Sequence, residues 1–418
     1  MRRPGDVTDA APSMLGFDLV RPLETDWRES LDDVAKMRRW PTSHDVSRLA
    51  RHVKALSAAY NDPTRARATA ATDGAARLGF FFARDVPKSA AAVRELVSTG
   101  AIGLDRDLRV LDLGAGMGAA TWGIARAIDA AGGRGKVEAT WVDPDRTALE
   151  VGVDLLRHRQ GAASLGIRVD AVAESLTRLG GLGSFDLIVA SGLLSELDVV
   201  ADGPTRVERH ATLLAHLIER HAASNGSLVI VEPALRDRTR HLHAVRNALL
   251  TRGHTVFAPC LHSAPCPALE RPPDWCHDDL RVDLPPWLIP VARASGLRYE
   301  GLTLAYLVIR RDGMRLADAL ACRETATRAR VVSEAMRSKG KRDAFLCGEF
   351  LTKDDDRATG VAARVRATRL DREGSELNAA WESVGRGDLL VFDPPLRSPS
   401  PRIGAFTAVR SVDRTPPR

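Results

Sequence analysis

Three cysteines lie close together in one proline-rich segment, APCLHSAPCPALERPPDWCHDDL. Cys260, Cys266 and Cys276 fall within 17 residues, and His262 and His277 lie beside them. Thiolates at short spacing, in a loop whose backbone is restricted by prolines, are typical of a site for a metal ion or a metal cluster. Three thiolates fall short of a four-thiolate site, so the sequence predicts a fourth ligand from elsewhere in the chain.

The chain offers two further cysteines for that fourth position. Cys347 in DAFLCGEF is the first candidate, Cys322 in ALACRE is the second, and a histidine is the remaining choice. The spacing does not distinguish an iron–sulfur cluster from zinc held by three cysteines and one histidine. The alternative is a chance cluster of buried thiols, since disulfides are improbable in a cytoplasmic protein.

A glycine-rich turn forms a second candidate site. It lies in RVLDLGAGMGAATWGIARAI, residues 109–128, between a predicted strand and a predicted helix. Gly114, Gly116 and Gly118 allow a sharp turn because they carry no Cβ. The turn opens onto a helix N-terminus whose unpaired N–H groups face outward. This arrangement is typical of a site for a nucleotide-like ligand.

Acidic residues near the turn favour one class of cofactor. Asp112 precedes the glycines, and D-x-G-x-G-x-G matches the first motif of class I methyltransferases better than a dinucleotide fingerprint. Asp143, after the second predicted strand, is expected to accept hydrogen bonds from two ribose hydroxyls. We therefore favour S-adenosylmethionine, with Glu174 near the adenine and Ser191 facing the methyl donor. The alternative is a tight turn with a surface aspartate.

A methyl-acceptor motif is missing from the expected position. After the fourth predicted strand, an enzyme that methylates exocyclic amines would carry Asn/Asp-Pro-Pro-aromatic, whereas this chain has ASGLLSEL. The Asp-Pro-Pro at 393–395 lies far downstream, and we interpret it as a turn. The sequence thus supports a cofactor pocket and identifies no catalytic residue.

Alternating strands and helices are expected to position the glycine turn. Apolar runs predict strands at 109–113, 137–142, 167–172, 185–190 and 227–232. Helical periodicity predicts helices at 118–131, 145–160, 205–223 and 239–252. This alternation predicts an α/β fold, a Rossmann-like parallel sheet with helices on both faces. A run at 303–309 is expected to be the last strand of that sheet.

The rest of the chain divides around this sheet. Residues 1–100 are expected to form a helical N-terminal domain, with helices at 45–60 and 88–99 capped by Asp45 and Ser89. Residues 101–311 form the methyltransferase-like domain, and 255–300 is a cysteine-rich insertion within it. Residues 312–396 are expected to form a small β-rich basic domain that begins with a helix at 314–329. Residues 397–418 are expected to be a flexible tail.

Composition and charge set further bounds. The chain is 44% hydrophobic and 27% charged, which argues against wholesale disorder. It contains no apolar run of about 18 residues, and we expect neither a signal peptide nor a membrane anchor, so we expect a cytoplasmic protein. Residues 310–418 hold 22 Lys and Arg against 16 Asp and Glu, whereas residues 1–309 hold 38 of each. This C-terminal excess suits a phosphate-backbone partner, although a solvated basic surface is the commoner explanation.

Taken together, these motifs resemble a known family. The combination of VLDLGAGMGAATW, FDLIVASGLLSEL, LVIVEPA, VFAPCLHSAPCP…WCH and LAYLVIRR is similar to the mitochondrial ribosomal small-subunit methyltransferase-like assembly factors and their bacterial relatives. The resemblance covers roughly residues 45–350. It implies a class I methyltransferase fold, a [4Fe-4S] cluster, and association with the RNA of the small ribosomal subunit, 16S rRNA in a bacterium. It also implies that Cys260, Cys266, Cys276 and Cys347 are the cluster ligands.

The leading hypothesis is therefore an S-adenosylmethionine-binding, iron–sulfur protein that acts on the small ribosomal subunit during its assembly, with or without methyl transfer. One alternative is an ordinary RNA or small-molecule methyltransferase with a structural zinc site. Another is a non-catalytic RNA-binding protein whose pocket is vestigial. The sequence leaves the oligomeric state and the methylated substrate open.

Overall fold

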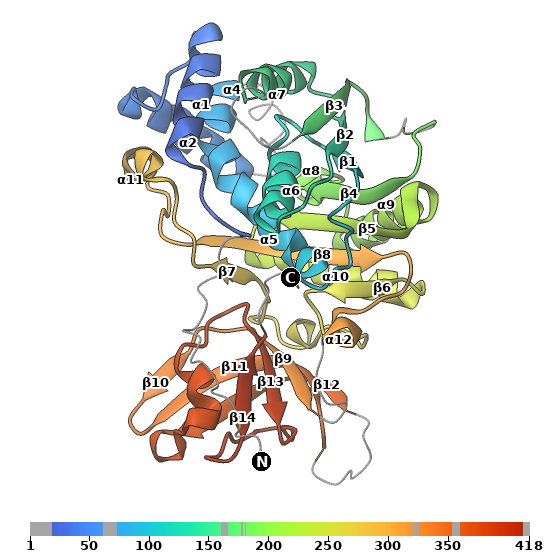
Figure 1. The fold of residues 1–418 in the computed structure, drawn as a ribbon, viewed down its shortest axis with the longest axis vertical. Helices are drawn as coiled ribbons and strands as arrows, with labels where there is room; N and C mark the ends of the chain where they lie inside the picture. Colours follow the sequence, from blue (N-terminus) through green and yellow to red (C-terminus); the bar gives the residue numbers. More distant parts are fainter. Residues whose placement is uncertain are drawn as a thin grey trace, which may run out of the picture.

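A large sheet and a smaller sheet form the two halves of the protein in the computed structural model (Figure 1). The structure describes residues 19–61, 73–159, 166–176, 179, 181–320, 326–352 and 360–412. In Figure 1 the large sheet and its helices fill the upper part, and the C-terminal sheet lies below them.

The large sheet has the order β3-β2-β1-β4-β5-β8-β6, and β7 pairs with β8. Strands β1 to β5 are parallel to one another, and β8 is antiparallel to both β5 and β6. Its strands are β1 (Leu108–Leu113), β2 (Val137–Val142), β3 (Ile167–Val172), β4 (Phe185–Ser191), β5 (Ala222–Glu232), β6 (Thr255–Ala258), β7 (Asp278–Leu280) and β8 (Leu302–Arg310). The predicted Rossmann-like α/β fold is confirmed.

Helices cover both faces of this sheet because its strands are apolar on both sides. Val110 of β1 belongs to one buried cluster and its neighbour Leu111 to another. The first cluster packs against α5, α6 and α7, and the second packs against α9 and α10. These helices are α5 (Phe82–Ser98), α6 (Ala119–Ala130), α7 (Arg146–Arg159), α9 (Gly203–His221) and α10 (Arg236–Thr251).

The N-terminal residues are helical, but one helix boundary differs from the prediction. Helix α5 begins at Phe82, directly after the π-helical turn η2 (Arg77–Phe81), and continues through Pro87. Ser89 is therefore a buried mid-helix residue and does not cap the helix. A proline inside a helix removes a hydrogen bond. The helix tolerates this loss because 13 of its 17 residues are buried, and because its backbone packs directly against Gly123 of α6.

Other helices precede α5 or follow strands of the large sheet. The segments before α5 are α1 (Thr25–Met37), α2 (Val46–Asn61) and α4 (Gly74–Ala76). The segments that follow strands of the large sheet are α8 (Leu193–Glu196), η4 (Pro267–Leu269), η5 (Pro286–Leu288), α11 (Ile289–Ser295) and α12 (Leu316–Ala319). Strands β6 and β7 lie within 255–300, so part of the predicted insertion joins the sheet. Within the described parts of the chain, no helix is long and apolar enough to cross a membrane.

The C-terminal sheet is antiparallel, with the order β10-β11-β9-β13-β14 and with β12 paired to β11. Its strands are β9 (Thr327–Val331), β10 (Met336–Ser338), β11 (Lys341–Phe350), β12 (Val361–Leu370), β13 (Leu389–Asp393) and β14 (Ala408–Ser411). Two 3-10 helices, η6 (Asp371–Glu373) and η7 (Glu376–Glu382), connect β12 to β13. Trp381 is fully buried in the core of this sheet.

Two C-terminal predictions were wrong. In the described part of the helix expected at 314–329, helical structure is confined to α12, and residues 327–329 instead belong to strand β9, whose Ala329 and Val331 enter the C-terminal core. Part of the segment expected to be a flexible tail forms β14, and Val409 is buried. Strand pairing, and not helical spacing, determines the structure here, because β9 pairs with β11 and β13 and β14 pairs with β13.

Candidate functional site

The glycine turn follows β1 as the sequence predicts. Gly114, Gly116 and Gly118 all have positive φ, at 67°, 55° and 82°. Gly118 precedes α6, and a Cβ there would lie 2.2 Å from the ring of Trp141. The turn therefore needs glycine both for its backbone conformation and for its close approach to the sheet.

Two buried carboxyl groups flank this turn. Asp143 accepts hydrogen bonds from the backbone N–H groups of Gly116 and Asp145, each at 2.8 Å. Asp112 accepts hydrogen bonds from the hydroxyl of Thr121 at 2.7 Å and from its N–H at 3.2 Å. Burial raises the pKa of Asp112 to about 7 despite these hydrogen bonds, and the charge of Asp143 adds to the increase. Each Asp143 oxygen keeps lone-pair capacity for a further donor.

A cavity of about 830 Å³ opens where β1, β2 and β4 end. Five of the residues predicted for the cofactor line it, namely Asp112, Gly114, Gly116, Asp143 and Ser191. The volume lies within the usual range for small-molecule and cofactor sites. The structure thus brings together residues from the ends of β1, β2 and β4.

Two other predicted cofactor residues do not line the cavity. Gly118 lies under the start of α6, where its role is packing against Trp141. Glu174 is absent from the lining, whereas its neighbour Ser175 contributes to it. The N–H of Glu174 bonds to the carbonyl of Val172 at 3.0 Å, and this tight turn redirects the chain after β3.

The N-terminal helices supply lining residues that the sequence analysis missed. Tyr60, Phe81, Phe82 and Asp85 contribute to the cavity wall, and Arg77 donates to Asp145 Oδ2 at 2.7 Å across it. None of these residues belongs to a motif, because their positions depend on how α2, η2 and α5 pack on the sheet. The π-helical turn that contains Arg77 is an unusual local feature, and periodicity does not reveal it.

A buried glutamate fixes the segment that follows β4. Glu232, at the end of β5, accepts hydrogen bonds from the N–H of Leu194 at 2.8 Å and from the hydroxyl of Ser195. Burial raises the pKa of Glu232 to about 7. These contacts hold α8, so that Leu193 and Glu196 line the cavity. The sequence ASGLLSEL therefore forms part of the cavity wall, although it lacks the expected acceptor motif.

The four cysteines of the predicted metal site line a second, smaller cavity. Cys260, Cys266, Cys276 and Cys347 surround a space of about 40 Å³ between the two sheets. This volume exceeds what one water molecule needs. Cys347 comes from β11 of the C-terminal sheet, and its Sγ lies 3.5 Å from His262 Nε2. Cys322 lies outside the described residues.

Arginines of α10 hold the cysteine loop in place. Arg246 donates from Nε to the Sγ of Cys260 at 3.2 Å and from its terminal nitrogens to the carbonyls of His262 and Ala264. Arg240 donates to further loop carbonyls, including that of Asp274 at 2.6 Å. These contacts satisfy the backbone of a segment with little regular structure.

Burial dominates the acid–base state of the thiols. It raises the pKa of Cys266 to about 11 and the pKa of Cys347 well above the usual range, and the neighbouring thiols add to both increases. A bound cation or cluster would reverse this effect, because coordination deprotonates thiols. Among the described residues, no three His, Cys, Asp or Glu side chains lie in an arrangement that could hold a single metal ion.

A buried ion network joins the cysteine loop to three other segments. Arg330 of β9 donates to Glu95 of α5 at 3.2 Å and to the carbonyl of Pro259 at 2.8 Å. Arg94 of α5 pairs with Glu95 and with Asp278 of β7. The side chains of all four charged residues are at least nine-tenths buried. Two cations thus face two anions where the C-terminal sheet meets the rest of the protein.

Comparison with known families decides what kind of protein carries these two sites. Residues 97–371, more than half of the chain, match the family described as mitochondrial small ribosomal subunit Rsm22.

The chain belongs to the Rsm22 family.

The Rsm22 match spans both candidate sites. It includes the glycine turn, Asp143 and the four cysteines of the smaller cavity. The N-terminal residues Tyr60, Arg77 and Asp85, which complete the larger cavity, lie before it. A comparison with curated proteins gave no match.

Several solved structures are similar to this Rsm22-family chain. A putative RNA methyltransferase from Pyrococcus horikoshii is 12% identical, with a TM-score of 0.31, and the match covers 54% of this chain and 81% of that one. A plantazolicin methyltransferase in complex with S-adenosylhomocysteine is 11% identical, with a TM-score of 0.32 and coverages of 64% and 98%. The N-methyltransferase NodS from Bradyrhizobium japonicum is 16% identical, with a TM-score of 0.31 and coverages of 55% and 97%.

Proposed function

We propose that this Rsm22-family protein binds S-adenosylmethionine in the larger cavity and acts on the small ribosomal subunit, through its 16S rRNA, during assembly. The observation that carries the proposal is the cavity of about 830 Å³ around the glycine turn and Asp143. The description of the family, mitochondrial small ribosomal subunit Rsm22, supports the ribosomal part. In this proposal Asp143 accepts hydrogen bonds from the ribose hydroxyls.

The charge of the cavity wall suits this cofactor. Six carboxyl groups and one guanidinium lie among the described lining residues: Asp85, Asp112, Asp143, Asp145, Glu196, Asp198 and Arg77. S-adenosylmethionine carries a positive sulfonium and a positive ammonium group. A predominantly acidic wall attracts such a ligand more strongly than a neutral or anionic one.

The smaller cavity is proposed to hold a [4Fe-4S] cluster on Cys260, Cys266, Cys276 and Cys347. Support comes from the donor set, because four thiols from two segments converge on one cavity and Arg246 donates to one of the sulfurs. Hydrogen bonds and positive charge near the sulfurs stabilise thiolate ligands. A bound cluster would supply a covalent connection between the cysteine loop and the C-terminal sheet.

Methyl transfer is not part of the proposal. The wall segment after β4 consists of Leu193, Ser195 and their neighbours, and Glu232 is occupied in holding that segment. We therefore assign no side chain as the general base that would deprotonate a methyl acceptor. The protein's own residues bind and orient the cofactor.

Removing the ribose-binding carboxylate tests the cofactor assignment. Asp143→Ala is expected to weaken S-adenosylmethionine binding at least about tenfold, because hydrogen bonds to a charged group contribute about 1.5–3 kcal/mol. Isothermal titration calorimetry measures this effect, with the exposed Asp170→Ala as a matched control that keeps wild-type affinity. An absence of binding heat in the wild-type protein would contradict the assignment.

Association with the subunit is tested separately. Tagged wild-type protein is expected to recover 30S precursors from a cell extract at low salt, and recovery should fall as salt increases because phosphate contacts release counterions. Asp143→Ala should recover the precursors equally well, because the substitution removes a proposed cofactor contact and no proposed RNA contact. If no precursor is recovered even at low salt, the ribosomal part of the proposal is wrong.

A further inference from the structure

A basic hairpin of the C-terminal sheet takes no part in either cavity. The strands β10 and β11 are joined through Gly340, and the segment RSKGKR carries Arg337, Lys339, Lys341 and Arg342. Arg337 is 72% exposed, and Lys339 is also exposed. Four cations within six residues therefore lie at one edge of this sheet.

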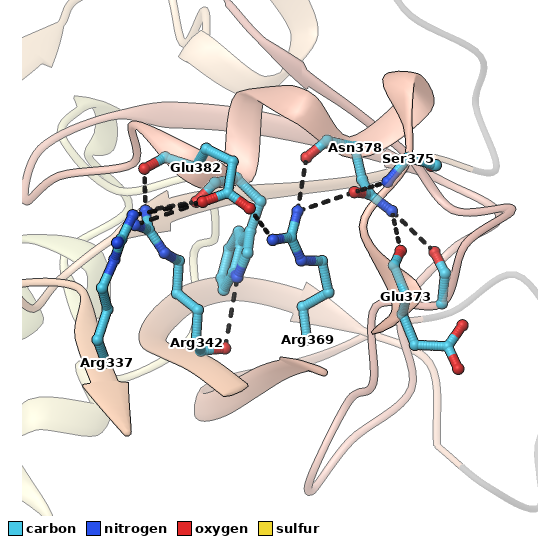
Figure 2. A network of polar contacts seen from close by, with 9 residues as sticks. Arg337, Arg342, Arg369, Glu373, Ser375, Asn378 and Glu382 are labelled. Atoms are coloured by element: carbon cyan, nitrogen blue, oxygen red, sulfur yellow. Dashed lines mark hydrogen bonds and ion pairs between the residues drawn. The ribbon is translucent and has the colours of Figure 1, made fainter. Parts of the chain in front are cut away.

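Two arginines of this hairpin and one from β12 converge on a single carboxylate (Figure 2). Arg337 and Arg342 contact Glu382 Oε2 at 3.4 and 3.5 Å, and Arg369 of β12 contacts Oε1. Arg342 and Arg369 are more than nine-tenths buried, whereas Glu382 is half exposed. Arg369 Nε is buried and has no hydrogen-bond partner. The single carboxylate of Glu382 does not balance three guanidinium charges, so the group has an excess of positive charge. The buried Nε–H of Arg369 also remains without an acceptor.

An exposed aromatic ring lies on a loop that is hydrogen-bonded to the segment carrying Glu382. Phe406 is 88% exposed, and it is the single aromatic residue among the large exposed hydrophobic side chains in the described part of the chain. Its neighbour Ala405 donates to Glu373 at 3.0 Å and accepts from Ser375 at 2.6 Å. The loop that carries Phe406 is therefore fixed before any partner binds, which lowers the entropic cost of binding.

One asparagine connects the ring to the arginines. Asn378 donates from Nδ2 to the carbonyl of Gly404 at 3.1 Å and accepts from Arg369 Nη1 at 2.9 Å through Oδ1 (Figure 2). Asn378 is fully buried. The loop of Phe406, the arginine group and the hairpin thus share one hydrogen-bonded frame.

We propose that this surface, made of the β10–β11 hairpin, Arg369 and Phe406, binds single-stranded RNA. Phe406 stacks on an unpaired base, and Arg337 and Lys339 contact the flanking phosphates. Fixed aromatic rings beside cationic side chains are the usual means of binding single strands, and a stacking ring requires a base that is free of its duplex. A phosphate competes with Glu382 for the arginines. This inference rests on the proposed ribosomal function and specifies the surface that serves it.

The test measures RNA affinity with the full-length protein. Fluorescence anisotropy with a labelled single-stranded RNA of about 12 nucleotides and with a duplex of the same sequence supplies the two readouts. Phe406→Ala is expected to weaken single-strand binding about tenfold and leave duplex binding nearly unchanged, while Phe406→Trp keeps wild-type affinity. A double variant, Arg337→Glu with Lys339→Glu, is expected to weaken binding and reduce the salt dependence of the affinity.

Matched controls remove an exposed apolar residue and reverse an exposed cation elsewhere, as Val200→Ala and Arg157→Glu, and both should bind as wild type. Equal loss of single-strand and duplex binding in Phe406→Ala would overturn the stacking role. If the hairpin and Phe406 variants bind RNA with wild-type affinity and still recover 30S precursors, the assignment of this RNA-binding surface is wrong. The proposed function would stand in that case. Reduced 30S recovery with unchanged RNA affinity would indicate a protein partner and overturn the inference. A wild-type protein that binds neither RNA nor 30S precursors would overturn both.

Discussion

Cys347→Ser protein purified without oxygen is expected to lack nearly all of the iron and sulfide of the [4Fe-4S] cluster that we propose for the wild-type protein. Cys347 is the one thiol of the smaller cavity that comes from the C-terminal sheet, where its register partners are Arg330 and Arg364. Serine offers a poor ligand to iron, and three remaining thiolates leave a cluster incompletely held. Visible absorption and metal analysis measure the loss.

The same substitution is expected to lower stability, because metal-binding free energy in such sites is folding free energy. Cys322→Ser is the matched control, since it removes the other C-terminal cysteine. If Cys322→Ser loses the iron and Cys347→Ser keeps it, the fourth ligand has been assigned to the wrong residue. A colourless wild-type protein with stoichiometric zinc would exclude the iron–sulfur cluster.

Arg330→Met is expected to lower the free energy of unfolding by about 3–5 kcal/mol, because it leaves two buried anions, Glu95 and Asp278, with Arg94 as the one remaining cation of the network. Arg330 is 3% exposed, and its guanidinium contacts Glu95, Asp278 and the carbonyls of Pro259 and Gly387. Methionine matches much of its volume but provides no charge and no donor. Urea denaturation measures the difference, with the exposed Arg337→Met as a control that should change stability by no more than about 0.5 kcal/mol.

A second substitution separates the charge effect from lost packing. Adding Glu95→Gln to Arg330→Met removes one uncompensated anion, and the double variant should be more stable than the sum of the single effects predicts. Additive effects, or an Arg330→Met protein as stable as Arg337→Met, would show that this network does not stabilise the junction of the two sheets.

The central sheet could be predicted closely from the sequence. Parallel strands that are buried on both faces leave near-continuous apolar runs, and β1, the most buried of these three strands, begins only one residue before its predicted bound. Strand β2 and the more exposed β3 have the predicted bounds. The glycine turn was equally clear, because positive φ and contact with Trp141 both require glycine. Local sequence patterns are sufficient to predict a structural element when the requirements of that element alone determine its residues.

The rest depended on contacts between distant segments. Arg77 reaches the cavity because the N-terminal helices pack on the sheet, and no local pattern records that packing. Ser89 resembled a helix cap after a proline, but burial of α5 outweighed the proline. Residues 327–329 form a strand and not the predicted helix, because pairing with β11 and β13 places Ala329 and Val331 in a core. The approach of Cys347 to the other thiols likewise required two sheets to meet.

The separation of these thiols along the chain also orders events during synthesis. Cys260, Cys266 and Cys276 leave the ribosome before Cys347, which follows Cys276 by 71 residues. At elongation rates of about 5–20 residues per second, the interval is roughly 4–14 s. Arg330 reaches Glu95 across 235 residues and also arrives late. The nascent chain therefore exposes a three-thiol intermediate for seconds, and the junction between the sheets closes only after most of the polypeptide has been made.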